Sequence, residues 1–523
     1  MKTKFLSTTD YRRLLCALIW VGSLGVFISP KNIYAQESDS LMAKRLEQFE
    51  YIVDCIEHKY ISGKRGISDE EWQRRVELAR SKVVAPNTTS YALRHMGTLI
   101  EDAHFAFPDG GLYNRFRRFS KEDSLLPLWV KTWIDGTVFV VNDYTGTIPK
   151  HAQILSVNSV NAQQAALTYR SQYAGEPLYA AANVNVWMEP DCRHWDNFSN
   201  YFFFEGIKPP YIVTYKVLGD TCTRKAILSP LSRGQITHLA KRTSDWERVK
   251  RMNGGSDKYM RYRRINDSTA VLEINLLWSK DYFGLLVLNR DNRFGRKLRR
   301  TMHRIEHQNI EHLVIDISKN GGGVSENMYK VFNYLTDKPI ETSELIHVTD
   351  DSREQLKIVI ENTGERYNGM TKKDYKLLAA RFDSIPNGTM VATDTLYDAY
   401  FYPQPIKHKF RGHSYLVTGP LTYSAAQLFA QIYQDLDIGP VIGQPCGGYR
   451  AVTLGNVANL KLPLHYWIPF GVPIGVAKAY VENGFTYNTV DVYVEQTFEE
   501  WLRDENNWVG TALEIIKEGT CPE

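Results

Sequence analysis

Cysteine is scarce in this sequence, and its spacing does not suit a metal site. Six cysteines occur in 523 residues; Cys16 lies in an N-terminal apolar run, and the other five are dispersed without a C-x-x-C pair. Zinc modules built on cysteine need such paired spacing. The sequence therefore argues against a zinc module, and we expect neither a metal nor a cofactor.

An excess of charge of one sign is also missing. The chain has 63 Lys and Arg against 59 Asp and Glu, and its first 35 residues hold five of these basic residues and one of the acids. The remainder therefore carries 58 of each sign. A chain without a basic surplus lacks the electrostatic footprint of a nucleic-acid binder. We therefore expect no nucleic-acid partner.

Beyond the N-terminus we expect no transmembrane anchor. The apolar run over residues 14–28 is shorter than the ~20 residues that span a bilayer. It follows four basic residues and precedes Ile33-Tyr34-Ala35, which offers small-residue cleavage before Gln36. This pattern predicts a secretory signal peptide over residues 1–35. The mature protein is then exported, to the periplasm or the extracellular space.

The length of the chain and the changes of residue pattern along it predict several domains. Hydrophobic residues make up 43% and charged residues 23%, as in a globular protein with a core. Residues 36–120 contain two amphipathic helical patterns, near 41–53 and 72–83. Short alternating runs over 121–231 predict strands, and a polar, basic stretch then predicts a linker. Residues 255–523 form the last and largest unit.

The most informative stretch of that unit runs from Tyr415 to Gly448. A short apolar run ends at Gly419-Pro420, and Ser424 then precedes apolar residues at helical spacing. The pattern predicts a strand, a turn and a helix, with Ser424 at the helix N-terminus. A serine there acts either as an N-cap, which is the commoner case, or as a nucleophile favoured by the helix end. This stretch alone leaves both open.

A second stretch carries three glycines directly after a predicted strand. His312 to Ile317 is an apolar run, and Gly321-Gly322-Gly323 follows shortly after it. Such a loop lets backbone N–H groups approach a ligand closely.

Together the two stretches resemble the S41 peptidases, the tail-specific or C-terminal-processing protease family. The family motif D-x-R-x-N-x-G-G corresponds to residues 316–323, T-x-S-A-[AS]-E to 422–427, and G-E-x-T-G-G to 443–448. The resemblance implies a mixed α/β, multi-domain fold: an N-terminal helical region, a PDZ-like domain, and a ClpP/crotonase-like ββα superhelix core. It also implies a serine-type peptidase that acts on proteins or peptides.

The resemblance carries roles onto five residues. Ser424 matches the nucleophile, and the backbone N–H groups of Gly322 and Ala425 match the oxyanion hole. Asp102-Ala103-His104 matches the D-x-H motif of the tricorn-like branch, which makes His104 the base. Glu482, in Glu482-Asn483-Gly484, resembles the charge-relay glutamate of that branch; the alternative is an exposed turn residue.

One further position selects between the two catalytic branches of the family. The other branch uses a Ser-Lys dyad, and Tyr449 stands where its lysine would be. Tyrosine, with a pKa near 10, is a poor base. The resemblance therefore favours the Ser-His branch. Ser318, Gln427 and Ala103 depart from the family pattern at positions that surround the reacting groups.

A second resemblance concerns the middle of the chain. Residues 148–158 are similar to the "I-P-x-G-x-x-I-x-x-I-N" hairpin of PDZ-like domains, with His151 in place of glycine. Such domains bind a peptide as an added β-strand. The aromatic-rich residues 179–215 either line a binding cleft or, more commonly, pack in a core.

Two alternatives and one misleading motif remain. One alternative is a non-catalytic binding protein on the S41 fold, for a peptide or a hydrophobic ligand. The other is a crotonase-like acyl-CoA enzyme, and the predicted export argues against it. His303-Arg304-Ile305-Glu306-His307 spells the zinc motif H-x-x-E-H. Its flanks are charged and short motifs match by accident, so we expect no zinc there.

Overall fold

The computed structural model describes most of the chain outside its termini and several internal segments. The described residues are 39–58, 60, 67–83, 99–104, 124–171, 175–187, 198, 201–202, 205–240, 242, 259–279, 291–350, 352–354, 366–367, 370–395, 398–450, 453–461, 469–478, 485–502 and 507–519. The predicted signal peptide over 1–35 lies outside them. In the described part, no helix combines the length and apolar character that crossing a membrane requires.

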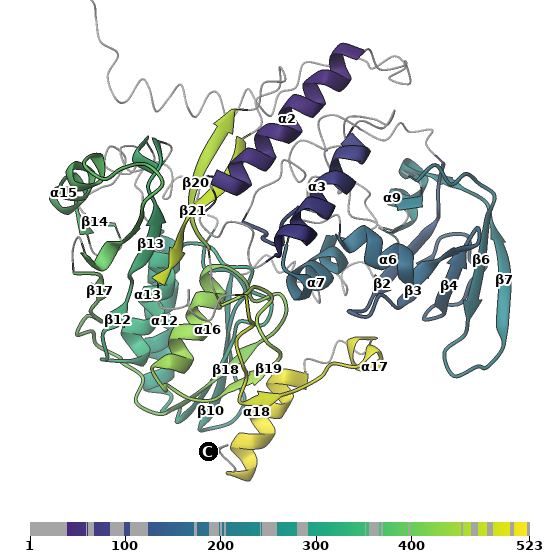
Figure 1. The fold of residues 1–523 in the computed structure, drawn as a ribbon. Coiled ribbons are helices and arrows are strands. Elements are labelled where there is room, and N and C mark those ends of the chain that lie inside the picture. Colours follow the sequence, from purple (N-terminus) through teal and green to yellow (C-terminus); the bar gives the residue numbers. More distant parts are fainter. Residues whose placement is uncertain are drawn as a thin grey trace, which may run out of the picture.

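A six-stranded sheet forms the centre of the C-terminal unit (Figure 1). Its strands, in spatial order, are β22 (Val492–Tyr493), β19 (Val441–Gly443), β18 (His413–Thr418), β11 (His312–Asp316), β10 (Thr269–Ile274) and β9 (Met260–Arg264). All neighbours are parallel except the edge strand β9. Parallel strands are covered on both faces, which explains why their sequences read as continuous apolar runs.

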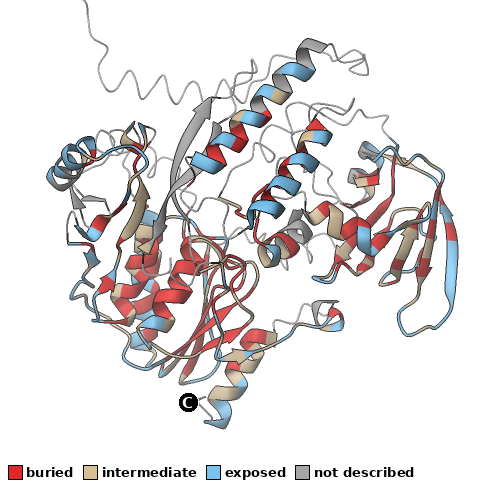
Figure 2. Cartoon of the chain, viewed as in Figure 1, coloured by how far each residue is buried: buried red, intermediate tan, exposed pale blue. Residues whose placement is uncertain are grey.

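Helices cover both faces of this sheet. On one face lie α12 (Asn292–His307), α13 (Ser325–Leu335) and α16 (Ala425–Asp435), which share one apolar core with the strands. On the other face lies α18 (Asn507–Glu518), which packs on Val271, Val314 and Val417. Figure 2 shows the strands and the inward helix faces as buried. The buried Asp291 begins α12, because its side chain accepts the N–H of Phe294.

A second, antiparallel sheet draws its strands from segments far apart in the chain. Its order is β16 (Met390–Ala392), β13 (Glu344–His347), β21 (Pro469–Ala477) and β20 (Thr453–Lys461). The segment between α13 and β18 supplies β13 and β16. It also contains α15 (Lys372–Asp383), the turn η2 (Thr393–Thr395), and two small strand pairs: β12 (Ile340–Glu341) with β17 (Tyr400–Phe401), and β14 (Arg366–Tyr367) with β15 (Met370–Thr371).

Residues 124–240 build their own sheet and core. The strands are β2 (Leu128–Thr132), β3 (Val138–Asp143), β4 (Gln153–Val157), β6 (Tyr211–Lys216) and β7 (Thr223–Leu228), with β5 (Val160–Asn161) beside β4. The helices are α6 (Ala162–Ser171), α7 (Pro177–Trp187) and α9 (Arg233–Ala240), and β1 (Ser124–Leu125) pairs with β8 (Leu231–Ser232). Phe198 and Phe202 are buried in this core, so these aromatic residues pack rather than line a cleft.

Both the 124–240 unit and the N-terminal helices contact the C-terminal unit. Phe498 of α17 (Phe498–Leu502), after the last core strand, stacks on Phe139 of β3 with ring centroids 4.0 Å apart. The N-terminal helices α2 (Asp39–His58) and α3 (Asp69–Val83) form an apolar cluster that Leu345 of β13 joins. The mixed α/β, multi-domain prediction is confirmed; the predicted boundaries between domains stay predictions.

Candidate active site

The two sequence motifs meet because their strands are neighbours. Strands β11 and β18 are parallel, and Asp316 of β11 lies opposite Val417 of β18. Loops that leave adjacent parallel strands at their carboxyl ends lie side by side. The glycine loop after Asp316 and the turn that carries Ser424 after Thr418 therefore share one edge of the sheet.

Asn320 locks the glycine loop against the serine turn. Its side-chain amide donates to the carbonyl of Ile274 at 2.8 Å, and its Oδ1 accepts the N–H of Gly322 at 2.9 Å. Its backbone carbonyl accepts the N–H of Tyr423 at 3.0 Å. Asn320 is fully buried, so these three bonds fix the loop without help from solvent.

Ser424 occupies the position that precedes α16, but it does not cap the helix. Its side chain makes no capping hydrogen bond, and its backbone has φ 56° and ψ −129°. A residue other than glycine at positive φ stores roughly 1–3 kcal/mol of strain, and such strain gathers at functional sites. The N-cap interpretation of Ser424 is therefore not supported by the geometry.

The hydroxyl of Ser424 instead faces His104. The distance from His104 Nε2 to Ser424 Oγ is 2.8 Å, across 320 positions of sequence. This is the length of a good hydrogen bond and lies within the reach that a general base needs. The His104 side chain is 16% exposed, so the pair is sheltered but open on one side.

Asp102 holds the segment that carries His104. Its side chain is fully buried, and its Oδ1 accepts the backbone N–H of His104 at 2.8 Å. The same oxygen lies 3.5 Å from His104 Nδ1, which is long for a hydrogen bond. The hydroxyl of Tyr60 donates to its Oδ2. Asp102 thus fixes the turn beneath the imidazole mainly through the backbone.

Tyr423 lies next to Ser424 in sequence and beneath His104 in space. The two rings stack with centroids 4.9 Å apart, and Tyr179 of α7 also stacks on Tyr423, with centroids 3.9 Å apart. The Tyr423 hydroxyl accepts the N–H of Ala103 at 3.2 Å and lies 2.8 Å from a carboxylate oxygen of Glu176 and 3.3 Å from Asp102. Burial, and next the negative charge of Glu176, raise the pKa of Tyr179, which keeps its hydroxyl neutral.

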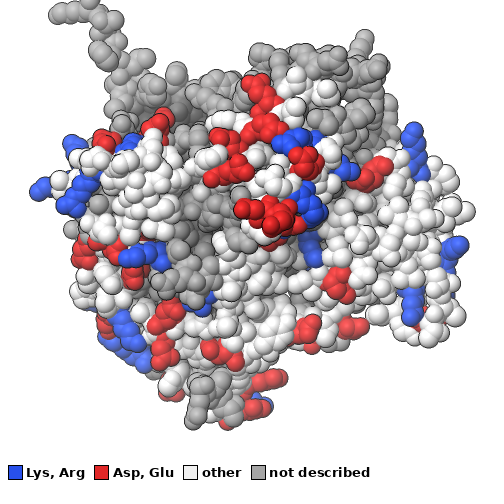
Figure 3. Space-filling model, in the orientation of Figure 1, with Lys and Arg blue, Asp and Glu red and all other residues white. Residues whose placement is uncertain are grey.

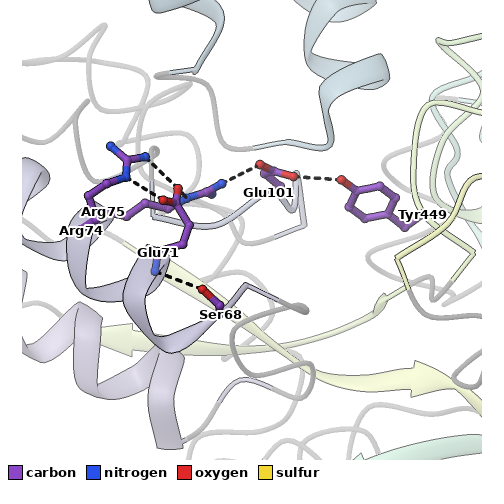
Figure 4. A network of polar contacts seen from close by, with 6 residues as sticks. All are labelled: Ser68, Glu71, Arg74, Arg75, Glu101 and Tyr449. Carbon is purple, nitrogen blue, oxygen red and sulfur yellow. Dashed lines mark hydrogen bonds and ion pairs between the residues drawn. The ribbon is translucent and has the colours of Figure 1, made fainter.

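Tyr449, which stands where the other branch has its lysine, is tied to the N-terminal helices (Figure 4). Its hydroxyl donates to Glu101 at 2.9 Å, and Glu101 forms an ion pair with Arg75 of α3 at 3.1 Å. Arg75 in turn pairs with Glu71 on the same helix at 2.8 Å. The loop that follows the third motif is thereby linked to the segment that presents His104.

The two oxyanion donors of the sequence prediction differ in their surroundings. The N–H of Ala425 opens α16, and the part of the chain that the structure describes contains no hydrogen-bond acceptor for it. The N–H of Gly322 donates to Asn320, so in this state it is engaged. Glu482 lies outside the described residues. The catalytic roles of all five residues therefore stay predictions.

The departures from the family pattern are accommodated by short polar contacts. Ser318 Oγ donates to Asp316 at 2.6 Å, and the Gln427 amide donates to the carbonyl of Tyr449.

Cys446 is fully buried, and burial raises the pKa of its thiol, which suits a packing residue rather than a nucleophile. Among the described residues, no group of three His, Cys, Asp or Glu side chains is placed to hold a metal ion, the H-x-x-E-H residues included.

Sequence reasoning gave no role to three residues that the structure brings to this site. The sequence contained a clue to Asp102, because this residue lies two positions before His104 in the D-x-H motif. The clue to Tyr423 was weaker, since it is only the sequence neighbour of Ser424. No sequence feature pointed to Glu176, which comes from the 124–240 unit and meets Tyr423 across 247 positions of sequence.

Comparison with known families decides what this arrangement resembles. Residues 282–468 match peptidase family S41. The match includes the glycine loop and Ser424 but neither His104 nor Glu482. It supports the S41 family, and with it a serine-type peptidase, for this chain; it does not identify the branch. No curated protein matches the sequence.

Solved structures share the fold of this chain. The structure of mature CPAF complexed with lactacystin aligns with a TM-score of 0.59 and 15% identity, over 91% of this chain and 98% of that one. The structure of mature CPAF aligns with a TM-score of 0.57 and 14% identity, over 91% and 97%. At these identities the likeness concerns the fold. The tricorn protease aligns with a TM-score of only 0.32 and carries no argument.

Proposed function

We propose that this protein is an exported serine endopeptidase that hydrolyses peptide bonds with Ser424 as nucleophile and His104 as general base. The observation that carries the proposal is the 2.8 Å contact between His104 Nε2 and Ser424 Oγ. A serine hydroxyl is a weak nucleophile without such a base. The Ser-His branch of the family is favoured because Tyr449, at the lysine position of the other branch, is engaged with Glu101.

The reaction proceeds in two acyl-transfer steps. His104 Nε2 takes the proton of Ser424 Oγ as this oxygen attacks the peptide carbonyl, and the tetrahedral intermediate then collapses as the same nitrogen gives the proton to the leaving amine. A water molecule, activated by His104, next attacks the acyl-serine and releases the second product. The strained backbone of Ser424 holds Oγ toward the imidazole through both steps.

The negative charge on the carbonyl oxygen needs donors near Ser424. The N–H of Ala425 lies at the positive end of α16, where the helix dipole adds to its effect. The N–H of Gly322 becomes a second donor when the oxyanion displaces the side chain of Asn320. Removal of one such donor lowers kcat by about 100-fold or more in comparable sites.

The imidazole also needs an acid to hold its tautomer. We assign this role to Glu482, and we assign to Asp102 the task of fixing the turn, because its Oδ1 lies 2.8 Å from the His104 N–H but 3.5 Å from Nδ1. Glu482→Gln should therefore lower kcat by orders of magnitude and leave the melting temperature nearly unchanged. Asp102→Asn should lower the melting temperature more and kcat less. The reverse ranking would make Asp102 the acid.

The 124–240 unit is assigned to substrate binding. In this proposal its PDZ-like hairpin takes an extended peptide near a free C-terminus by strand addition. Its helix α7 reaches the active site directly, since Tyr179 stacks on Tyr423 and its N–H donates to the carbonyl of Gly447 at 3.2 Å. Peptide bound to this unit is thereby held close to Ser424.

The test uses four variants of the mature chain against an unfolded protein substrate. Ser424→Ala and His104→Ala should each lower kcat by several orders of magnitude, and the double variant should be little worse than either, because these residues act as a unit. His307→Ala, an exposed histidine on α12, is the matched control and should retain full activity.

Two results would contradict the proposal. A His104→Ala enzyme that kept most of its activity would remove the base. A wild type with no hydrolysis, and no labelling of Ser424 by a fluorophosphonate or by lactacystin, would place the chain among non-catalytic binding proteins. Lactacystin is included because a structure of mature CPAF contains it.

A further inference from the structure

The outer surface of α12 carries a row of arginines. Five are exposed on this 16-residue helix, and we call them the basic stripe: Arg293, Arg296, Arg299, Arg300 and Arg304. The inner surface is buried in the main core, through Phe294, Leu298, Met302 and Ile305. The helix therefore cannot turn, and the stripe stays at the surface. The only acid exposed on the helix is Glu306.

The basic stripe differs from an ordinary solvated helix face in the same chain. On α3, Glu71 pairs with Arg74 and Arg75, and Glu77 pairs with Arg80. The molecular face in Figure 3 likewise shows acidic and basic side chains intermixed. On α12, by contrast, Arg296, Arg299 and Arg300 form no ion pair with any residue that the structure describes. Like charges three and four positions apart destabilise a helix by about 0.2–0.5 kcal/mol per pair, so this spacing carries a cost.

The described acids beside the C-terminal half of the stripe, Glu306 and Asp337, already have partners. The loop 406–411 lies against the C-terminal half of α12, with the rings of His303 and His408 4.6 Å apart. Glu306 pairs with His408, and Asp337 forms ion pairs with Lys409 and with Arg411. The loop also presents the exposed Lys407 beside α12, although the chain after residue 35 has equal numbers of acids and bases.

We propose that the basic stripe docks this protein on the surface of an anionic phospholipid bilayer. Arginine binds phosphate oxygens with two parallel donors, which suits lipid headgroups. The stripe extends about 16 Å along the helix, at about 1.5 Å per residue from Arg293 to Arg304. A compact anion would reach two neighbouring arginines, whereas a headgroup layer contacts the whole row and the adjoining loop.

The docking is electrostatic, without insertion. The apolar side chains of α12 are already used in the core, so none remains to enter the acyl region. Each basic residue near an anionic surface contributes about 1 kcal/mol, and the attraction fades within a Debye length. Binding should therefore disappear between about 0.1 M and about 1 M salt, where that length shrinks from about 10 Å to about 3 Å.

The experiment measures cosedimentation of the full mature chain with vesicles. The vesicles are phosphatidylcholine with and without phosphatidylglycerol, at low and high salt. We expect binding to the anionic vesicles at low salt. The variant Arg296→Gln/Arg299→Gln/Arg300→Gln should lose about 100-fold in partitioning, which corresponds to about 1 kcal/mol for each charge removed. The corresponding triple Arg→Lys variant should retain most of the binding.

The matched control removes three exposed charges elsewhere. Lys208→Gln/Arg224→Gln/Lys225→Gln changes the net charge equally on the 124–240 unit and should leave binding unchanged. The α12 variant should melt no lower than the wild type, because it relieves repulsion, and should hydrolyse soluble peptide as before. The proposal would be overturned if the α12 Arg→Gln variant and this control variant lost binding equally. It would also be overturned if the wild-type protein bound neutral vesicles, or if it bound only an oligonucleotide.

Discussion

Replacement of Gly322 by alanine tests how closely the glycine loop and the nucleophile fit together. A Cβ added at Gly322 would lie 2.7 Å from Ser424 Cβ and 2.8 Å from the Tyr423 carbonyl oxygen, and the residue has φ +105°. Carbon atoms in contact normally stay about 3.5–4.0 Å apart. The added methyl therefore must push the loop away from Ser424, or the loop must change its backbone.

The expected cost has two parts. Positive φ strains an alanine by roughly 1–3 kcal/mol, and overpacking in a tight site adds a further 1–3 kcal/mol or so. The free energy of unfolding should fall by about 2–6 kcal/mol, a large part of the ~5–15 kcal/mol that holds a typical domain. A shift of about 1 Å at the reacting atoms can lower kcat by about 100-fold. Urea unfolding and peptide hydrolysis measure the two effects.

The neighbouring glycine provides the control. Gly321 is exposed, and a Cβ there would meet only the hydroxyl of Tyr179, at an ordinary 3.8 Å. Gly321→Ala should change stability by no more than about 0.5 kcal/mol and should remain active. A Gly322→Ala protein with wild-type stability and activity would refute the geometry of the loop. Equal damage from both substitutions would point to a general sensitivity of the loop.

Two further predictions concern the Tyr423 hydroxyl and the Glu344 carboxyl. Tyr423→Phe should lower stability by about 1–3 kcal/mol, because it leaves the half-buried Ala103 N–H and the buried Glu176 without this partner. It should also lower kcat with little change in KM; thermal melts and steady-state kinetics measure both. Burial raises the pKa of Glu344 to about 7, so the folded state holds a proton that the unfolded chain loses near pH 4.3. Stability should therefore fall as pH rises from about 4.3 to 7, and Glu344→Gln should remove that dependence and be the more stable protein above pH 7. Parallel pH dependences of the two proteins would contradict it.

Strong local patterns made the core of the fold predictable. The strand expected over residues 312–317 is β11, His312–Asp316, and the helix expected after Ser424 is α16, Ala425–Asp435. Both have a buried apolar pattern bounded by turn or cap residues, so tertiary contacts reinforce the local preference. The encounter of Ser424 with His104 was predictable only through the D-x-H resemblance, because nothing local marks His104.

Pairings between distant, half-buried segments were not predictable. Strand β13, Glu344–His347, mixes charged and apolar residues and gains its structure by pairing with β21, more than 100 positions later in the chain. The contact of Glu176 with Tyr423 likewise depends on how the 124–240 unit meets the core. Such contacts depend on the closure of long loops, for which a short window of sequence contains no signal.

The separation of His104 from Ser424 by 320 positions has a consequence for the order in which activity arises. During synthesis from the N-terminus, the proposed base leaves the ribosome long before the nucleophile, and the two meet only after the core sheet has formed around β18. A nascent or truncated chain that ends before residue 424 holds half of the catalytic pair and cannot cleave its neighbours. If the proposed function holds, chain topology alone keeps an incomplete chain inactive.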